Sequence, residues 1–186
     1  YVVHPVNSGC LGGSGGAALK IEATIEALIN GTISMSGSDG RCLTPISYNN
    51  NDFHASGAGS GGSIWIVTSN LRGSGVIQAN GGNSVKSRRS HTLVDNQGGA
   101  GGGGRIAVYC TTSDYTGTLS SKGGDIEHAL DKYNLHQAQC AGGGTIYQNC
   151  GNIVDSLSFD GSKTCPSPFS VRLFEDSSTV HLENLR

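Results

Sequence analysis

Ionisable side chains gather in three polar segments of the chain, residues 38–56, 83–97 and 125–141. They offer the acids, bases and cations that polysaccharide cleavage requires as general acid, general base and charge stabiliser. No two segments place the same acid and base at the same offset, and no calcium-binding Gly-Gly-x-Gly-x-Asp pattern occurs. We therefore favour solvated loops over a catalytic site. The residues are Asp52 and His54 in the first segment, Lys86, Arg88, Arg89, His91 and Asp95 in the second, and Asp125, Glu127, His128, Asp131 and His136 in the third.

A glycine-rich segment followed by a short strand occurs four times in the sequence. These repeated elements must position the polar segments. The predicted strands cover residues 18–23, 63–68, 105–110 and 145–150. Their first inward apolar residues are spaced by 45, 42 and 40 positions, which is the range of repeat architectures. These alignment residues are Leu19, Ile64, Ile106 and Ile146.

A second strand follows each time and obeys the pattern Gly-x-[Ile/Leu]-x-x-x-Gly around Ile33, Ile77 and Leu119. A fourth copy around Leu157 begins with Asp155 in place of glycine, and we expect it to stack on the other three. Two strands per repeat favour parallel stacking over a propeller, which needs four strands per blade. The prediction is an all-β parallel β-helix, or β-solenoid, of about four to five coils with Gly-rich corners and polar inserts.

Alternation at period two assigns the two faces of the first strands. One face is apolar and predicts a core shared by successive repeats. The opposite face carries Trp65, Tyr109 and Tyr147. These aromatic rings are candidates for contact with a glycan or a partner, or they pack beneath a polar segment.

The glycine runs precede the strands at a fixed offset, as in residues 12–16, 57–62 and 98–104. Such runs are often flexible linkers. A linker has no reason to recur at this offset, so we expect the glycine backbones of neighbouring repeats to pack directly against each other.

Six cysteines permit fifteen pairings. Cys110 and Cys150 occupy the same position in consecutive repeats, so their Cα atoms should lie about 4.8 Å apart, within disulfide range. We predict that bridge. Elimination then suggests Cys10–Cys42 and Cys140–Cys165. An even count without a Cys-x-x-Cys pair argues against zinc and favours an oxidising compartment.

One N-glycosylation sequon is present, Asn30-Gly31-Thr32. It falls at the corner before a second strand, so we expect Asn30 to be exposed and able to carry a glycan.

Composition favours an extracellular, secreted or cell-surface protein. The chain has 186 residues, 30 of them glycine, with a formal net charge of −2. This balance gives no indication of a nucleic-acid partner, no apolar run is long enough to cross a bilayer, and no cofactor or metal is implied. Without an initiator Met or a signal-like stretch, we expect a mature product or a section of a longer protein.

We expect one domain over residues 1–186, with repeats near 9–56, 57–97, 98–141 and 142–165 and a degenerate last coil at 166–186. Neither end of the sequence looks like a solenoid cap, because Tyr1-Val2-Val3 is apolar and Leu185-Arg186 follows a strand directly. The sequence therefore suggests end-to-end association with another copy or module.

The phrases GSGGSIWI, GSGVIQANGG and GGAGGGGRIAVYC resemble the glycine-rich repeats of very large secreted or cell-surface proteins of protists and plants. The resemblance covers residues 12–161 and implies a parallel β-helix with a role in scaffolding, adhesion or surface filaments. It supplies no catalytic residues.

Three functions follow as expectations. The first is an extracellular structural protein that forms or decorates a surface filament or scaffold by end-to-end stacking. The second is a glycan-binding adhesin module. The third is a polysaccharide lyase or hydrolase, and on balance we expect no enzyme.

Overall fold

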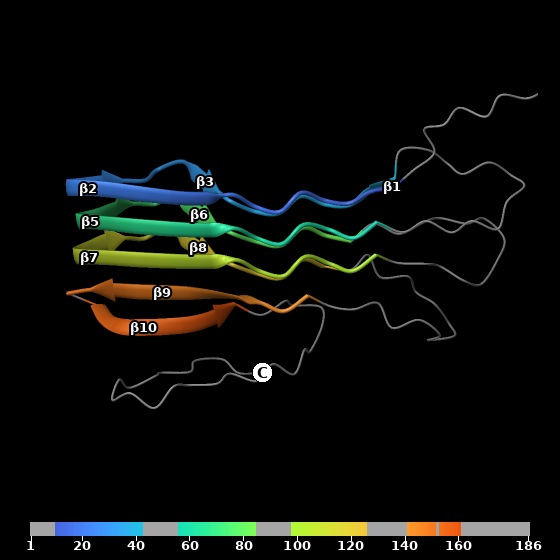
Figure 1. Ribbon diagram of the computed structural model, residues 1–186. Helices are drawn as coiled ribbons and strands as arrows, with labels where there is room; N and C mark the ends of the chain where they lie inside the picture. Colours follow the sequence, from blue (N-terminus) through green and yellow to red (C-terminus); the bar gives the residue numbers. More distant parts are fainter. Residues whose placement is uncertain (1–9, 43–55, 85–97, 126–140, 152, 161–186) are drawn as a thin grey trace, which may run out of the picture.

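The computed structural model of the chain describes residues 10–42, 56–84, 98–125, 141–151 and 153–160 (Figure 1). Strands and no helix occur in these segments, and most strand pairs are parallel. The prediction of an all-β protein with parallel sheets is confirmed.

The largest sheet has five strands in the order β10-β9-β7-β5-β2. Four of them run parallel, one from each repeat, because an apolar strand face that a single repeat cannot bury is covered when like strands align. Three of these strands have eleven residues, longer than the six predicted. The strands are β2 (Ala18–Leu28), β5 (Ser63–Gly73), β7 (Arg105–Tyr115), β9 (Gly144–Cys150) and β10 (Ile153–Asp160).

The register of the parallel strands is the one predicted from the repeat step. Ile64 pairs with Leu19 on one side and with Ile106 on the other, and Ile106 pairs with Ile146. We call such a set of equivalent residues in successive repeats a register column. A slip by one residue would turn every apolar side chain outward, so burial of one face fixes this register.

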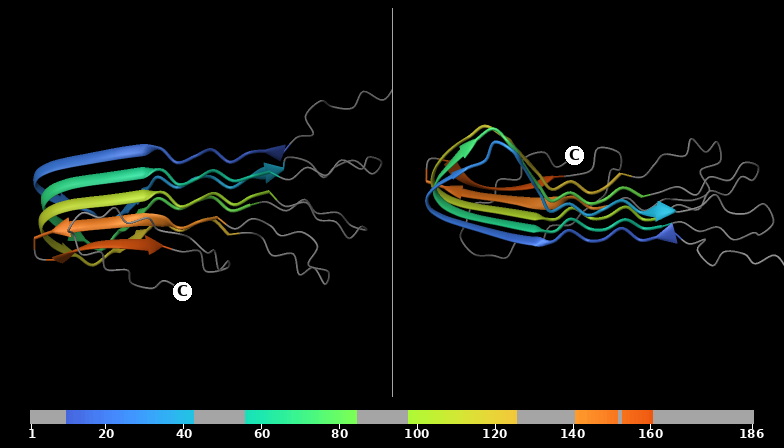
Figure 2. Two further views of the ribbon diagram at one scale, coloured as in Figure 1. Left: turned by 60° about the horizontal axis from the view of Figure 1, so that its bottom comes forward. Right: turned by 90° about the horizontal axis from the view of Figure 1, so that it is seen from above.

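A second, three-stranded sheet faces the first and consists of β3 (Thr32–Ser34), β6 (Val76–Gln78) and β8 (Thr118–Ser120). Each of the first three repeats turns after its long strand and returns along this sheet (Figure 2). The core lies between the sheets and is fully formed in the middle repeats, where Ile66, Ile77 and Val108 are completely buried. In the first repeat Ile21 and Ile33 are only partly buried, because no repeat lies above them in the described chain.

The fourth second strand does not join the three-stranded sheet, so this part of the prediction was wrong. β10 pairs antiparallel with β9 and is the edge of the five-stranded sheet. β9 ends after seven residues, and Ile153 pairs with Cys150, so only two residues connect the strands. A two-residue connection produces a hairpin.

The glycine runs are not corners, as the sequence suggested, but extended segments beside the sheets (Figure 1). They form two stacked layers, which we call the first and second glycine layers. The first precedes the long strands and the second follows the short strands. The first layer comprises residues 12–17, 57–62, 99–104 and 141–143, and the second comprises residues 35–40, 79–84 and 121–125.

Backbone hydrogen bonds join the glycine layers in two directions. The amides of Ala58 and Gly61 donate along the first layer to the next repeat, at 3.0 and 2.8 Å. The amides of Gly59 and Gly62 donate across to the second layer, to Ser38 O at 2.9 Å and Met35 O at 2.8 Å. Hydrogen bonds in each of the two directions recur at every third residue of the chain, which is the period of a polyproline II helix.

This arrangement requires glycine at the positions that face the other layer or the preceding repeat, because no space is left there for a side chain. A Cβ atom on Gly103 would overlap the carbonyl oxygen of Ser121 in the second layer, and one on Gly104 would overlap the carbonyl oxygen of Gly62. By contrast, a Cβ on Gly102 would point outward, 3.9 Å from its nearest neighbour, Gly142 O. The expected packing of glycine backbones between repeats is confirmed.

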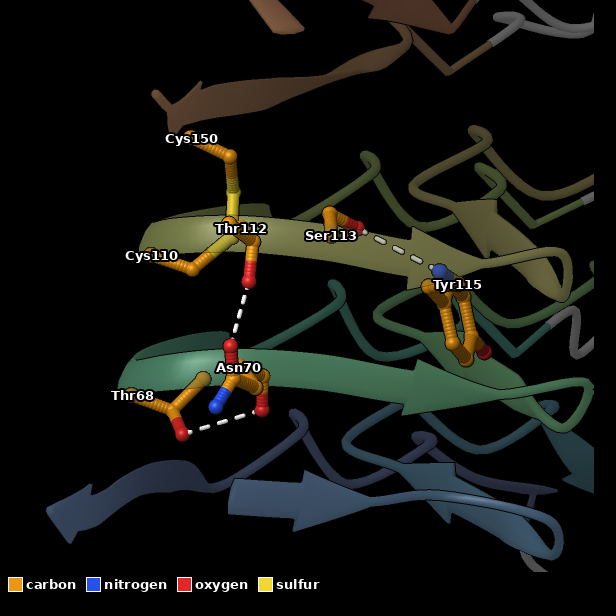
Figure 3. Close-up of a disulfide and its surroundings, with 7 residues drawn as sticks. All are labelled: Thr68, Asn70, Cys110, Thr112, Ser113, Tyr115 and Cys150. Atoms are coloured by element: carbon orange, nitrogen blue, oxygen red, sulfur yellow. Dashed lines mark hydrogen bonds between the residues drawn. A yellow bond between two sulfur atoms is a disulfide. The ribbon is translucent and has the colours of Figure 1, made fainter. Parts of the chain in front are cut away.

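The predicted Cys110–Cys150 disulfide is present and joins the third and fourth repeats (Figure 3). The two Cα atoms are 4.4 Å apart, since the residues are register partners in β7 and β9. Thr68 occupies the same column in β5. The bridge fixes the last residue of β9 directly before the chain reverses into β10.

A short antiparallel pair, β1 (Cys10–Leu11) and β4 (Arg41–Cys42), lies at the end of the glycine layers farthest from the long strands (Figure 1). Its register places Cys10 opposite Cys42. The backbone therefore agrees with the Cys10–Cys42 pairing, which stays a prediction. Cys140 and Cys165 lie outside the described residues.

We predict that Gly103→Ala destabilises the fold and that its neighbour Gly102→Ala does not. The inward Cβ must displace backbone, which costs about 1–3 kcal/mol in a packed interior, whereas the outward one should change stability by less than about 1 kcal/mol. Urea denaturation of both variants measures the difference. Equal stability of the two would contradict the direct packing of the glycine layers.

We predict that Cys110→Ala/Cys150→Ala lowers the free energy of unfolding by about 3–4 kcal/mol, because the bridge closes a loop with a sequence separation of 40. Thermal and urea unfolding of the double variant and of the oxidised parent provide the comparison. If both unfold at the same urea concentration, the bridge does not hold the fourth repeat in place.

Candidate functional site

The outward face of the five-stranded sheet carries the aromatic residues selected from the sequence. Trp65 lies on β5, Tyr109 on β7 and Tyr147 on β9, which we call the aromatic cluster. These three residues point away from the core, because the residues next to them in the strands, Ile64, Ile66, Ile106, Val108 and Ile146, are buried.

The rings of the aromatic cluster contact one another across three repeats. The centroids of Trp65 and Tyr109 are 5.5 Å apart with 28° between the ring planes, and those of Tyr109 and Tyr147 are 5.6 Å apart at 57°. Trp65 and Tyr147 both belong to the column of Ala107, whose small side chain leaves room for Tyr109 beside them. Such pairs stabilise a sheet by about 0.5–1.5 kcal/mol each.

The chemistry open to this cluster is stacking against a flat apolar ring. Trp65 is 48% exposed, so part of its ring is accessible although one side packs on Tyr109. Asn149 donates to the Tyr147 hydroxyl at 3.3 Å and fixes that ring. The cluster therefore stabilises the sheet and also leaves an apolar surface for contact.

Charged groups flank the cluster. Lys20, the register partner of Trp65, forms an ion pair of 2.6 Å with Glu22, and both side chains are exposed. Arg105 is exposed and lies two residues before Ala107, on the same face of β7. Exposed ion pairs contribute little stability, so the main effect of these groups is on the charge of the face.

Tyr115 ends β7 and serves the fold rather than this face. Its hydroxyl donates to Gly75 O at 2.7 Å, and its ring lies where a Cβ on Gly117 would be. Burial raises the pKa of the phenol above its ordinary value of 10.0, so the group stays protonated and donates at neutral pH.

The sequon residue Asn30 is exposed, as expected, between β2 and β3. Its Oδ1 accepts the amide of Ser74 at 3.3 Å, and the space around Gly31 is open. Occupation by a glycan stays a prediction.

Of the acid and base candidates in the polar segments, only Asp125 is described. It is exposed at the end of the second glycine layer, and its amide donates to Asn83 Oδ1 at 2.8 Å. The others lie outside the described residues. Each polar segment leaves and rejoins the described chain at the end of the glycine layers away from the long strands (Figure 1).

The part of the chain that the structure describes holds neither a cluster of metal ligands nor a membrane-spanning helix. No group of three or more His, Cys, Asp or Glu side chains is placed there to hold a metal ion. That part also has no helix of the length and apolar character needed to cross a membrane.

Two residues that bear on the ends of the stack were not singled out from the sequence. The Ser38 hydroxyl accepts the amide of Ser14 at 3.0 Å, and the Asp160 carboxylate accepts the amide of Ser121 at 2.9 Å. Both are ordinary polar residues whose role depends on where the layers end, so no sequence motif marks them.

Comparison with known proteins adds no identification. No protein-family model, curated protein or solved structure matches the chain.

Proposed function

We propose that the chain is an extracellular structural module, a β-solenoid whose four stacked repeats form a rigid scaffold at a cell surface. The observation that carries this proposal is the bonding of the glycine layers in two directions, along each layer and across to the other. A catalytic or small-ligand domain has no need of such a backbone lattice, whereas a load-bearing one gains stiffness from it.

The solenoid interpretation rests on the repetition of one path. Every repeat consists of a glycine segment followed by a long strand. In the first three repeats a short strand and a second glycine segment come next. Each repeat contacts the next through the same columns, so stability accumulates from neighbour to neighbour. The resemblance to glycine-rich surface proteins favours the same architecture.

The extracellular location is supported by the Cys110–Cys150 bridge. Such bridges persist in oxidising compartments and are rare in reducing ones. A disulfide between the last two parallel strands also suits a protein that must stay folded outside the cell without chaperones.

We predict that antibodies raised against the chain label the cell surface or extracellular material of its source organism in immunogold electron microscopy. In the same material, alkylation without reduction should leave Cys110 and Cys150 unmodified. Labelling confined to the cytosol, or alkylated cysteines in the native protein, would overturn the extracellular assignment.

A second candidate function is glycan binding by the aromatic cluster. The exposed part of Trp65 offers an apolar surface, and Arg105 adds a positive charge on the same face. Together they favour a sugar polymer with carboxylate groups, which the ring contacts by stacking and the guanidinium by charge.

We predict that Trp65→Ala weakens binding to acidic oligosaccharides on a glycan array by about tenfold, the equivalent of one lost stacking contact. The matched control is Ile25→Ala, which removes another exposed apolar side chain, 76% accessible, from β2. Equal binding by both variants, or no binding by the parent chain, would remove this candidate.

Polysaccharide cleavage remains a third proposal, without an observation that favours it, because nearly all of its acid and base candidates lie outside the described residues.

A further inference from the structure

The two ends of the repeat stack differ from its middle in which residues occupy the glycine columns. In the middle repeats, three register columns hold only glycine. A Cβ atom at any of these positions would point toward the preceding repeat. A Cβ atom on Gly62, Gly104 or Gly144 would overlap the carbonyl oxygen of the preceding member of its column. The same holds for Gly59 and Gly101 in a second column, and for Gly82 and Gly124 in a third.

The first repeat has larger residues in these three columns, namely Ala17, Ser14 and Ser38. All three are exposed, because no repeat lies before them in the described chain. A preceding repeat built like the others would place its carbonyl oxygens where these side chains now are. The column of Gly31, Gly75 and Gly117 stays glycine throughout, so the change is confined to the glycine layers. In the fourth repeat Ala141 stands in the column of Ser14, at the first residue of its described segment.

Ser38 also replaces the hydrogen-bond acceptor that a preceding repeat would supply. The amides of Gly59 and Gly101 donate to the second layer of the repeat before, to Ser38 O and Gly82 O. The equivalent amide of Ser14 donates instead to the Ser38 hydroxyl at 3.0 Å, and that hydroxyl lies 3.2 Å from Ser14 O. A side-chain oxygen thus takes the position of a missing backbone carbonyl.

The opposite end uses the same device. The amides of Met35 and Ala79 donate to the following repeat, to Gln78 O and Ser120 O. The equivalent amide of Ser121 donates at 2.9 Å to the Asp160 carboxylate, which the reversed strand β10 brings to this position. The Ser120 hydroxyl donates to the same carboxylate oxygen at 3.2 Å.

We infer that the stack is terminated at both ends by its own side chains, and that its first repeat is a surface that rejects a second copy of the repeat. Ala17 and Ser38 exclude a like backbone, while Ser38 and Asp160 each satisfy one of the amides that such a backbone would have satisfied. The module is therefore a finite unit. The end-to-end ladder suggested by the sequence does not form through these ends. This inference rests on the stack alone and not on the extracellular role.

The test adds one repeat to the full chain at two places. A copy of residues 57–98 contains no cysteine and begins and ends in register, so it can be inserted directly before Gly12 or, as the internal control, between residues 98 and 99. The readout is amide hydrogen exchange of Ala58 and Gly61 in the inserted copy, whose amides donate to the following repeat, compared with the same two amides in the parent chain.

We expect the internal copy to be protected like the parent repeats and the N-terminal copy to exchange like an unfolded peptide. Replacing the three residues in the N-terminal insertion, as Ser14→Gly/Ala17→Gly/Ser38→Gly, should restore protection. Protection of the N-terminal copy without these replacements would overturn the inference, and so would a failure of the replacements while the internal copy is protected. Light scattering of the parent chain should give the monomer mass, and filaments that grow with concentration would equally overturn it.

Discussion

The fold depends on backbone hydrogen bonds between extended segments that have no side chains on their facing sides. In a sheet, neighbouring strands bond in one direction and side chains occupy the other two. In the glycine layers a second direction is also used, because amides such as that of Gly62 reach a carbonyl in the opposite layer at 2.8 Å. Glycine raises the conformational entropy of the unfolded chain and therefore makes folding more costly. In return, the backbones pack closely and few of their polar groups remain without a partner.

The apolar core and the glycine layers perform complementary tasks. Between the two sheets, side chains such as Ile66 and Ile77 hold the sheets apart and bury apolar surface. Beyond the sheets, the same two chain segments approach until their backbones bond directly (Figure 2). The core fixes the register, and the glycine layers convert that register into a stiff plate, because a slip would place Cβ atoms or unpaired amides in the lattice.

Much of this could be predicted from the sequence. The repeat step and period-two alternation indicate the register, and the register in turn predicts the Cys110–Cys150 bridge. The spacing of Leu157 does not predict the reversal of β10, because the hairpin depends on the two-residue connection Gly151-Asn152 and not on the repeat step. The roles of Ser38 and Asp160 could not be predicted. Each side chain takes the place of a backbone carbonyl of a neighbouring repeat, and that place is defined only by the assembled layers. The aromatic residues were assigned to the correct face, but their mutual stacking depends on diagonal contacts between strands.

The most direct measurement of the central claim is the detection of scalar couplings across the proposed hydrogen bonds by nuclear magnetic resonance. With the chain labelled in nitrogen and carbon, the account predicts correlations from the amide nitrogen of Gly59 to the carbonyl carbon of Ser38, and from Gly62 to Met35. These connect the first glycine layer of one repeat with the second layer of the repeat before. Correlations of these amides only with carbonyls in their own layer, or with none, would contradict a lattice bonded in two directions.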